Sequence, residues 1–368
     1  MKVLHLYKDY YPILGGIENH VRALAEGQAR RGLDVTVLTT STSGKTIVEW
    51  QDGIRVVKAG RIATVASTPI SWKLIAWLWR LEADLVHLQF PYPWGEMAYL
   101  LAGRKRPLII TYQSDVVRQA RLLRLYRPLL WRVLGRAKWL IATSQRYLET
   151  SPYLGRFKDR CQVIPLGIDH GRFSKPRPDQ AEAIRGRFRK PLLLFVGRLR
   201  YYKGLQYLIT AMNELDAVLL VIGSGQMEVP WKTLARELNV EKKVFFLGDV
   251  PDSELPGYYQ AADVFVLPST HRSEAYGVSL LEAMASGLPV VSTELGTGTS
   301  FVNQHGRTGL VVPAGDSLAL ARALHELLGD DARRRALGQC ASERVEKEFS
   351  LEAMVDSVIE LYQRTLQG

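Results

Sequence analysis

Cysteine is nearly absent from this 368-residue chain, which contains only Cys161 and Cys340. The two lie far apart and outside any metal-ligand spacing, which argues against a disulfide framework and favours a reduced compartment. Long apolar runs are missing too: the stretch 74–81 contains Arg80, and crossing a bilayer needs about 20 residues. The first apolar run, 3–7, is typical of a strand rather than a secretory signal, so we expect a cytoplasmic protein.

Acidic residues are outnumbered, with 37 Asp and Glu against 48 Lys and Arg and a formal net charge of +11. The stretch 118–138 contains no acid, and Leu122, Leu125 and Leu129 are spaced for one helical face. Together with the Trp-rich segment 71–80, it favours an anionic membrane surface as a partner. Two core-packed helices with solvated arginines are the alternative. No nucleic-acid recognition motif is present, so no nucleic-acid partner is expected.

Short apolar, β-branched runs alternate with helix-like stretches along the whole chain. They occur at 3–7, 35–40, 54–59, 85–89, 108–112, 140–143, 162–165, 192–196, 217–222, 244–247, 264–267, 289–292 and 309–312. Continuous hydrophobicity suits strands that are buried on both faces of a parallel sheet. The alternation and the length predict an α/β protein with two doubly wound, Rossmann-like domains.

A linker is indicated at 174–179, where Ser-Lys-Pro-Arg-Pro-Asp combines two prolines with charges. We therefore expect one domain at 1–174, a second at 175–349, and a terminal helix at 350–368 that returns to the first domain. Ligands of such sheets bind at the carboxyl ends of the strands, so the cleft between the domains is the expected site.

Two glycine-containing motifs follow the first expected strand of each domain. Gly15 and Gly16 open a helix, where backbone N–H groups can meet a phosphate, although a tight turn without a ligand is equally compatible. In the second domain, Arg198 and Lys203 lie in a Gly-Arg-Leu-Arg-Tyr-Tyr-Lys-Gly loop. A guanidinium and an ammonium suit a diphosphate, and a basic loop on a basic protein is the alternative.

The stretch 268–291 holds two acidic residues in unusual surroundings. Glu274 lies in a polar loop after an expected buried strand, and Glu282 lies inside an apolar helix that Gly277 opens. A carboxylate in such a helix needs a partner, and a ribose diol can donate both of its hydroxyl hydrogens to one. An ordinary loop glutamate and helix glutamate are the alternative.

These motifs resemble the signature of glycosyltransferase family 4, whose members are retaining enzymes of the GT-B fold. That signature is two glutamates separated by seven residues, then a helix and Gly-x-Pro-Val-Val. The matching positions in this chain are Glu274, Gly277, Glu282, Gly287 and Pro289, with Arg198, Lys203, Gly15 and Gly16 in the other two motifs. The resemblance covers essentially the whole chain, in the family's order.

The resemblance implies a role for each matching residue. Arg198 and Lys203 would hold the donor diphosphate, Glu274 the transferred sugar, and Glu282 the ribose. The donor pocket would also include Gly15, Gly16, Tyr276, Gly277 and Val278, largely through backbone N–H groups. Glu274, Arg198 and Lys203 would form the catalytic set, and the N-terminal domain would bind the acceptor.

The resemblance further implies that no metal ion or cofactor takes part. Consistently, no Asp-x-Asp pair is placed to hold a divalent ion. The expected partners are a nucleotide-sugar donor and a saccharide or lipid-linked acceptor. The leaving phosphate would help to accept the proton in a same-face attack, so no enzymic nucleophile is needed.

Two positions depart from the family pattern. Gln113 stands where relatives often have a sugar-contacting His, so hydrogen bonding is kept but protonation is lost. Asp115 remains a candidate for the acceptor or sugar side. The Gly-Thr-Gly-Thr-Ser run at 296–300 replaces a common acidic residue, and it is similar to a subgroup that adds mannose or rhamnose to lipid-linked polysaccharide.

Three alternatives to a lipid-linked or membrane-surface acceptor stay open. The same transfer could use a small soluble acceptor, such as a sugar phosphate. A GT-B-fold sugar-nucleotide epimerase would turn over the donor without an acceptor. A non-catalytic binding module would bind the donor without transfer, although Arg198, Lys203, Glu274 and Glu282 argue against it.

Overall fold

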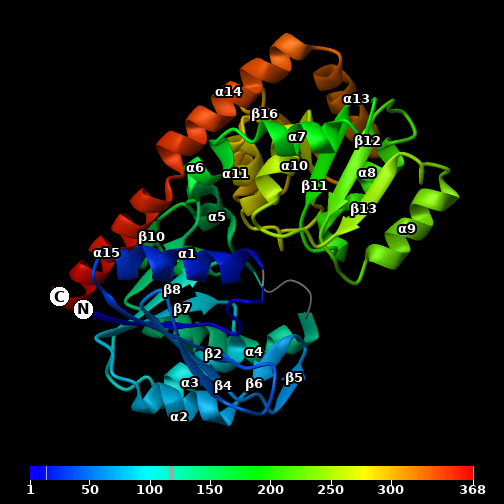
Figure 1. Cartoon of the computed structure of the whole chain (residues 1–368). Helices are drawn as coiled ribbons and strands as arrows, with labels where there is room; N and C mark the ends of the chain where they lie inside the picture. The colour runs from blue at the N-terminus through cyan, green and yellow to red at the C-terminus, as the bar shows by residue number, and fades with distance from the viewer. Residues whose placement is uncertain (14, 116–119, 368) are drawn as a thin grey trace. The chain divides into compact units, whose positions relative to one another are not determined.

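The change from one folding unit to the next comes earlier than the proline-rich segment 174–179. The computed structural model describes residues 1–13, 15–115 and 120–367, with the backbone alone for 120–125, and it divides into two units (Figure 1). Unit 1 consists of Met1–Gly167 and Leu351–Gly368, and unit 2 of Ile168–Ser350. The boundary precedes 174–179 because helix α6 (His170–Ser174) already packs against helices of unit 2.

Unit 1 is built on a twisted sheet in the order β10-β9-β8-β7-β1-β2-β4-β3. Its strands are β1 (Lys2–Leu6), β2 (Asp34–Thr40), β3 (Ile47–Gln51), β4 (Ile54–Ala59), β7 (Leu85–Phe90), β8 (Leu108–Tyr112), β9 (Trp139–Ala142) and β10 (Cys161–Val163). The central strands are fully buried and pair in parallel, as the continuous apolar runs predict. The order reverses between β1 and β7, which is where ligands of such sheets bind.

One edge of this sheet departs from the expected parallel pattern. Strand β3 pairs with β4 antiparallel, through a turn at Asp52 and Gly53 in which both residues have positive φ. Asp-Gly is the preferred sequence for such a turn. A second hairpin joins β5 (Ala63–Val65) and β6 (Thr68–Ile70).

The helices of unit 1 cover both faces of the sheet, with α1 and α15 on one face and α2 and α3 on the other (Figure 1). They are α1 (Gly16–Arg30), α2 (Trp72–Arg80), α3 (Pro93–Ala102), α4 (Ala120–Arg136), α5 (Gln145–Thr150), the 3-10 helix η1 (Leu154–Arg160) and α15 (Leu351–Gln367). Helix α15 completes the core: Val355, Val358 and Leu361 pack with Leu24 of α1 and Leu85 of β7.

Unit 2 has an all-parallel sheet in the order β13-β12-β11-β14-β15-β16. Its strands are β11 (Leu192–Val196), β12 (Val218–Ile222), β13 (Val244–Gly248), β14 (Val264–Leu267), β15 (Val290–Glu294) and β16 (Gly309–Pro313). Its further helices are α7 (Pro178–Arg185), η2 (Tyr201–Lys203), α8 (Leu205–Ala211), α9 (Glu228–Glu237), α10 (Leu255–Ala261), α11 (Val278–Ala285), α12 (Thr299–Val302), α13 (Ser317–Leu328) and α14 (Asp331–Glu348). Here the order reverses between β11 and β14.

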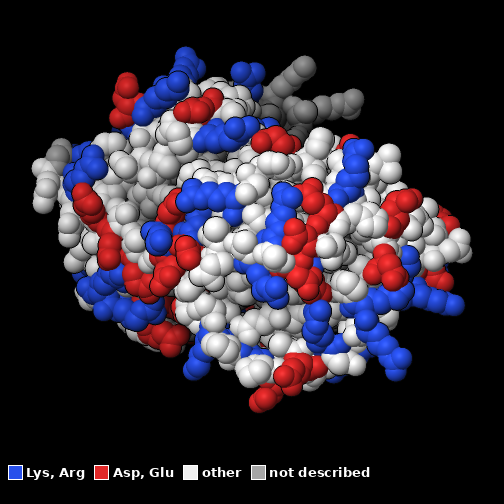
Figure 2. Space-filling model, turned by 90° about the horizontal axis from the view of Figure 1, so that it is seen from above, with Lys and Arg blue, Asp and Glu red and all other residues white. Residues whose placement is uncertain are grey.

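The distribution of charge bears on the excess of basic residues. On the face in Figure 2, Lys and Arg are interspersed with Asp and Glu, so no single-sign patch forms there. The structure describes only part of the acid-free stretch 118–138: Arg118 lies outside the described residues, and the side chains of Arg121 and Arg124 are not described. Within the described part of the chain, no helix is long and apolar enough to cross a membrane.

Candidate active site

The loops predicted to carry the chemistry of unit 2 flank the point where its strand order reverses. The loop after β11 holds Arg198 and Lys203, and the loop after β14 holds Glu274. Because β11 and β14 are neighbouring parallel strands, both loops leave the same edge of the sheet. This is the position at which doubly wound sheets bind their ligands.

A buried ion pair joins the two loops. The Lys203 Nζ lies 2.6 Å from the Glu274 Oε2, and both side chains are about nine-tenths buried. The Ser269 hydroxyl donates to the same Glu274 oxygen at 3.0 Å. Burial is the largest single effect and lowers the pKa of Lys203, but the charge and hydrogen bond of Glu274 act together with Tyr202 and Glu282 in the other direction. In sum the pKa is raised, so the ammonium keeps its proton.

Gly204 lets the two loops approach each other. Its φ is +66°, and a Cβ there would lie 2.0 Å from the Pro268 carbonyl oxygen. Any larger residue would push the Lys203 loop away from the Glu274 loop. The glycine of this motif therefore acts through the backbone, by making the ion pair possible. Arg198, which follows β11 closely, has an exposed side chain.

Glu282 lies on α11 and is partly buried. Its Oε2 accepts a hydrogen bond from the Tyr259 hydroxyl of α10 at 2.7 Å. Burial raises the pKa of Glu282 to about 7, although the bond from Tyr259 acts in the opposite direction. The helix thus holds a carboxylate that is poised between its two protonation states near neutral pH.

The N-terminus of α11 offers backbone donors. The helix starts at Val278, and its N-cap Gly277 has a φ of +80° and no side chain to cap the first turn. Free N–H groups at such an end attract an anion. The ring of Tyr276, which precedes this N-terminus, is buried and meets Phe349 edge-on.

The run 296–300 braces the Glu274 loop, a role that the sequence did not reveal. The Thr297 hydroxyl donates to the Glu274 carbonyl at 2.8 Å, and the Gly298 N–H donates to the Ala275 carbonyl at 2.7 Å. Arg272 donates to the Gly296 carbonyl at 2.8 Å. The Thr297 hydroxyl and the backbones of Gly296 and Gly298 therefore position a loop whose glutamate lies more than 20 residues away in sequence.

In unit 1, Gly15 caps α1 and Gly16 is its first residue. A Cβ on Gly15 would meet the Glu18 carboxylate at 2.3 Å, whereas a Cβ on Gly16 would meet open space. Local packing therefore requires neither glycine, because the Glu18 carboxylate is the flexible end of a side chain and can move. The Glu18 carboxylate folds back against the helix N-terminus, and a phosphate arriving there would have to displace it.

Gln113 and Asp115 are buried beside the end of β8. The Gln113 Nε2 donates to the Gln89 Oε1 at 3.1 Å, which leaves its carbonyl oxygen for another partner. Asp115 accepts from the hydroxyls of Tyr112 and Ser151 at 3.0 and 3.2 Å. These contacts hold both side chains in place, and sequence reasoning missed the three partners.

Comparison with known proteins identifies the family of this chain. A family model named Glycosyltransferase Family 4 matches residues 14–172, and one named Glycosyl transferases group 1 matches 177–344. The D-rhamnosyltransferase WbpZ of Pseudomonas aeruginosa is 36% identical over 95% of this chain and 92% of its own length. The O-antigen chain mannosyltransferase C of Escherichia coli is 34% identical over the full length of both chains.

Solved structures share the fold. A sucrose-phosphate synthase from Thermosynechococcus elongatus superposes with a TM-score of 0.84 at 26% identity, covering 99% of this chain and 98% of that one. WaaG, a glycosyltransferase involved in lipopolysaccharide biosynthesis, superposes with a TM-score of 0.72 at 20% identity over 98% and 99%. From its sequence relatives, the chain belongs to glycosyltransferase family 4 and is a nucleotide-sugar glycosyltransferase with the GT-B fold.

Proposed function

We propose that the enzyme transfers a hexose, with retention of configuration, from a GDP-mannose-like or UDP-hexose donor to a hydroxyl of a lipid-linked or saccharide acceptor. The observation that supports this most strongly is the Lys203–Glu274 ion pair, near Glu282 at the switch point of unit 2. The names of two relatives, a rhamnosyltransferase and an O-antigen chain mannosyltransferase, favour a mannose or rhamnose type of sugar.

In this proposal, Lys203 and Arg198 neutralise the departing diphosphate. The Lys203 ammonium has three donors, so it can keep Glu274 and still bind a phosphate oxygen. Arg198 adds a two-pronged contact from an exposed position. Because the phosphate gains charge as the anomeric C–O bond breaks, these fixed cations stabilise the transition state more than the ground state.

The two glutamates would divide the donor between them. The Ser269 hydroxyl and the Lys203 ammonium both occupy one Glu274 oxygen, and its second oxygen suits a hydroxyl of the transferred sugar. Tyr259 likewise occupies one oxygen of Glu282, which would receive the ribose hydroxyls. Backbone N–H groups at Tyr276–Val278 would complete the pocket.

Unit 1 would supply contacts on the sugar and acceptor side. Since Gln113 uses its amide nitrogen on Gln89, its carbonyl oxygen would accept a hydrogen bond from a sugar hydroxyl. Asp115 would face the acceptor, and Gly15 and Gly16 would approach the donor through the backbone. A same-face attack requires no enzymic nucleophile, unlike a retaining glycosidase.

The test is to follow the anomeric configuration by NMR with a panel of donors and a saccharide acceptor, with and without excess chelator. We expect an α-linked product from an α-linked donor, and the same rate with chelator, because Arg198 and Lys203 replace a metal ion. An inverted product would overturn retention. Donor that is epimerised without an acceptor would favour the epimerase instead.

We also propose that unit 1 contacts an anionic membrane surface. Arg127, Arg132 and Arg136 of α4 are exposed, as are Trp72 and Trp79 of α2 at 60% and 52%. Helices α2 and α4 both pack against α3, and arginines and tryptophans exposed on neighbouring parts of one domain are typical of an interfacial surface. We expect salt-sensitive sedimentation with vesicles that contain phosphatidylglycerol and none with phosphatidylcholine alone. No sedimentation at low salt would favour a small soluble acceptor.

A further inference from the structure

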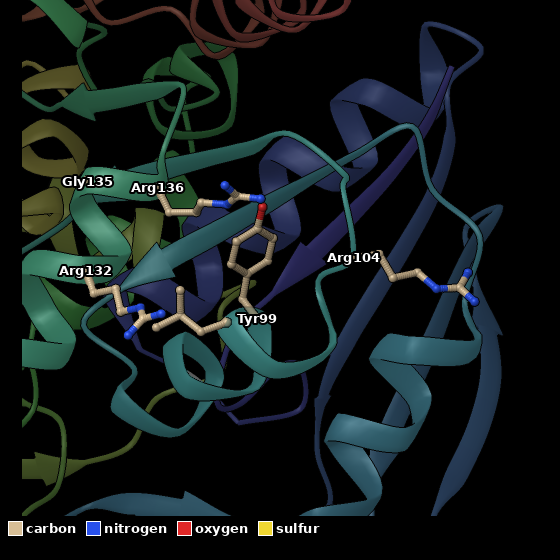
Figure 3. A pocket seen from close by; sticks show the side chains of 6 residues that line it. Tyr99, Arg104, Arg132, Gly135 and Arg136 are labelled. Atoms are coloured by element: carbon tan, nitrogen blue, oxygen red, sulfur yellow. The ribbon is translucent and has the colours of Figure 1, made fainter.

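A cationic pocket of about 360 Å³ lies between α3 and α4, near their C-terminal ends (Figure 3). Its lining residues are Tyr99, Leu100, Arg104, Arg132, Gly135 and Arg136. Figure 3 shows Arg136 reaching toward the Tyr99 hydroxyl, and Arg132 entering from the same helix. Arg132 and Arg136 are one helical turn apart, a spacing at which like charges repel each other.

The two arginines keep their charge uncompensated by acids. Within the described part of the chain, neither Arg132 nor Arg136 has an Asp or Glu within ion-pair distance. The nearest acid on α3, Glu96, is buried and bound to Tyr126 and the Tyr92 N–H. An anion would therefore relieve the repulsion without displacing an acidic partner.

The carbonyl groups at the helix ends, which would repel an anion, are already covered. Arg160 donates to the carbonyls of Gly135 and Ala137 at 3.0 and 2.9 Å. Arg106 donates to the Ala102 and Gly103 carbonyls at the end of α3, at 3.1 and 3.0 Å. The arginines bonded to these carbonyls offset part of the negative charge at the helix ends, and the fork geometry of a guanidinium matches a phosphate.

Exposed apolar side chains neighbour two of the lining residues. Leu101, which follows Leu100, is 63% exposed, and Trp79, which contacts Arg104, is 52% exposed. The Arg104 side chain points away from Tyr99 in Figure 3, and its guanidinium lies over the Trp79 ring at 4.4 Å. A phosphate-binding centre with an exposed aromatic ring, an exposed aliphatic side chain and a further cation nearby suits the boundary between headgroups and acyl chains.

The pocket is remote from the sugar side of unit 1. Helices α3 and α4 run back from the carboxyl ends of β7 and β8, so their C-terminal ends lie near the starts of β8 and β9. Gln113 and Asp115 lie at the opposite, carboxyl edge. A ligand of this pocket is therefore an anchor and not the acceptor.

We propose that the pocket binds the phosphate of an anionic phospholipid headgroup. This inference deepens the membrane contact proposed above and rests on it for the source of the phosphate. The experiment compares the wild type with the pair Arg132→Gln and Arg136→Gln on phosphatidylcholine vesicles with and without phosphatidylglycerol. A matched control removes two exposed arginines of unit 2, with Arg322→Gln and Arg335→Gln.

We expect the pocket variant to lose about thirtyfold in vesicle affinity, since each arginine near an anionic surface contributes about a factor of five. The control should lose far less, and nucleoside diphosphate binding should stay unchanged in both. Equal losses in the pocket variant and the control would show that the pocket is not a specific binding site and that vesicle binding depends on the overall positive charge of the surface.

Titration with soluble glycerol phosphate separates the two sources of a phosphate group. We expect weak binding without vesicles, because the exposed side chains of Trp79 and Leu101 then have no apolar partner. A different outcome is that glycerol phosphate binds tightly, that this binding depends on Arg132 and Arg136, and that the wild type does not bind vesicles. In that case the lipid is ruled out as the source of the phosphate, and the site binds a free phosphorylated compound. That result would also contradict the proposed membrane contact without touching the transferase chemistry.

Discussion

Lys203 shows how one residue serves both the fold and the proposed chemistry. Its ammonium joins two loops through Glu274, and the neighbouring acidic groups keep it charged despite its burial. We expect Lys203→Ala or Arg198→Ala to lower turnover about a hundredfold, roughly 3 kcal/mol, with a smaller loss of donor affinity. Steady-state kinetics combined with calorimetry on the free nucleoside diphosphate measures both. Near-normal turnover in both variants would show that Lys203 and Arg198 do not stabilise the departing diphosphate.

The two glutamates should separate in the same assays. Glu282→Ala is expected to weaken binding of the free nucleoside diphosphate, because the ribose loses its acceptor. Glu274→Gln should leave that binding nearly intact and impair sugar transfer, since its carboxylate faces the transferred sugar in our proposal. Calorimetry that gives the opposite pattern would exchange the two roles.

Glu282 also predicts a pH dependence. Because burial raises its pKa to about 7, the carboxylate that accepts ribose hydroxyls forms only as pH rises through that value. Nucleoside diphosphate affinity should increase up to about tenfold between one unit below and one unit above it. Glu282→Gln should flatten this component, and an unchanged slope in that variant would assign the titration to another group.

The same raised pKa has the opposite effect on stability. The folded state binds the Glu282 proton more tightly than the unfolded chain, whose ordinary value is 4.5. The contribution of this group to the free energy of unfolding is therefore fully present below 4.5 and is lost as pH rises to about 7. Binding and stability thus respond to the titration of Glu282 in opposite directions.

At the scale of elements, helix α15 is tied to the centre of unit 1 by a buried polar chain. Gln28 donates to the Tyr362 hydroxyl at 3.1 Å, and that hydroxyl bonds to the His87 Nδ1. The second ring nitrogen of His87, Nε2, is hydrogen-bonded to the Thr111 hydroxyl at 2.7 Å. Burial lowers the pKa of His87 well below its usual value, so the chain is neutral.

Removing the hydroxyl should therefore destabilise unit 1. We expect Tyr362→Phe to lower the free energy of unfolding by about 1–3 kcal/mol, because buried groups of Gln28 and His87 lose a partner. Tyr11→Phe at a 39% exposed position is the matched control and should change little. Denaturant unfolding measures both variants, and equal stability of the two would show that the chain contributes little.

At the scale of the whole molecule, the two units differ in how the chain forms them: unit 1 combines two separate segments, whereas unit 2 is formed by one. Unit 2 is one continuous segment with its own sheet and all of Lys203, Glu274 and Glu282. We expect the fragment 168–350 to fold and to bind nucleoside diphosphates in calorimetry without transferring sugar, and to lose that binding with Lys203→Ala. The fragment 1–167 lacks α15 and should aggregate, because the apolar face that Val355 and Leu361 cover becomes exposed. A well-folded 1–167 fragment would contradict this role of α15.

Much of this could be predicted from the sequence because its signals are local. Continuous apolar runs place the buried strands within a residue or two, and the loops with Arg198, Lys203 and Glu274 follow from their spacing. The antiparallel edge β3 was missed, although Asp52-Gly53 is a hairpin signal, because strand–helix alternation describes only crossover connections. The proline-rich segment misplaced the boundary because helix α6, just before it, packs into unit 2.

By itself, the sequence determined the residue types and their order: the paired glutamates, the basic loop, the glycines and the alternation of strands and helices. Only the tertiary structure decided which of them meet. The pairing of Lys203 with Glu274, the bracing of Glu274 by Thr297, and the chain from Gln28 to Tyr362 join residues that are distant in sequence. Such contacts depend on which strands become neighbours and on how closely glycines let their loops approach, and neither is written in the local pattern.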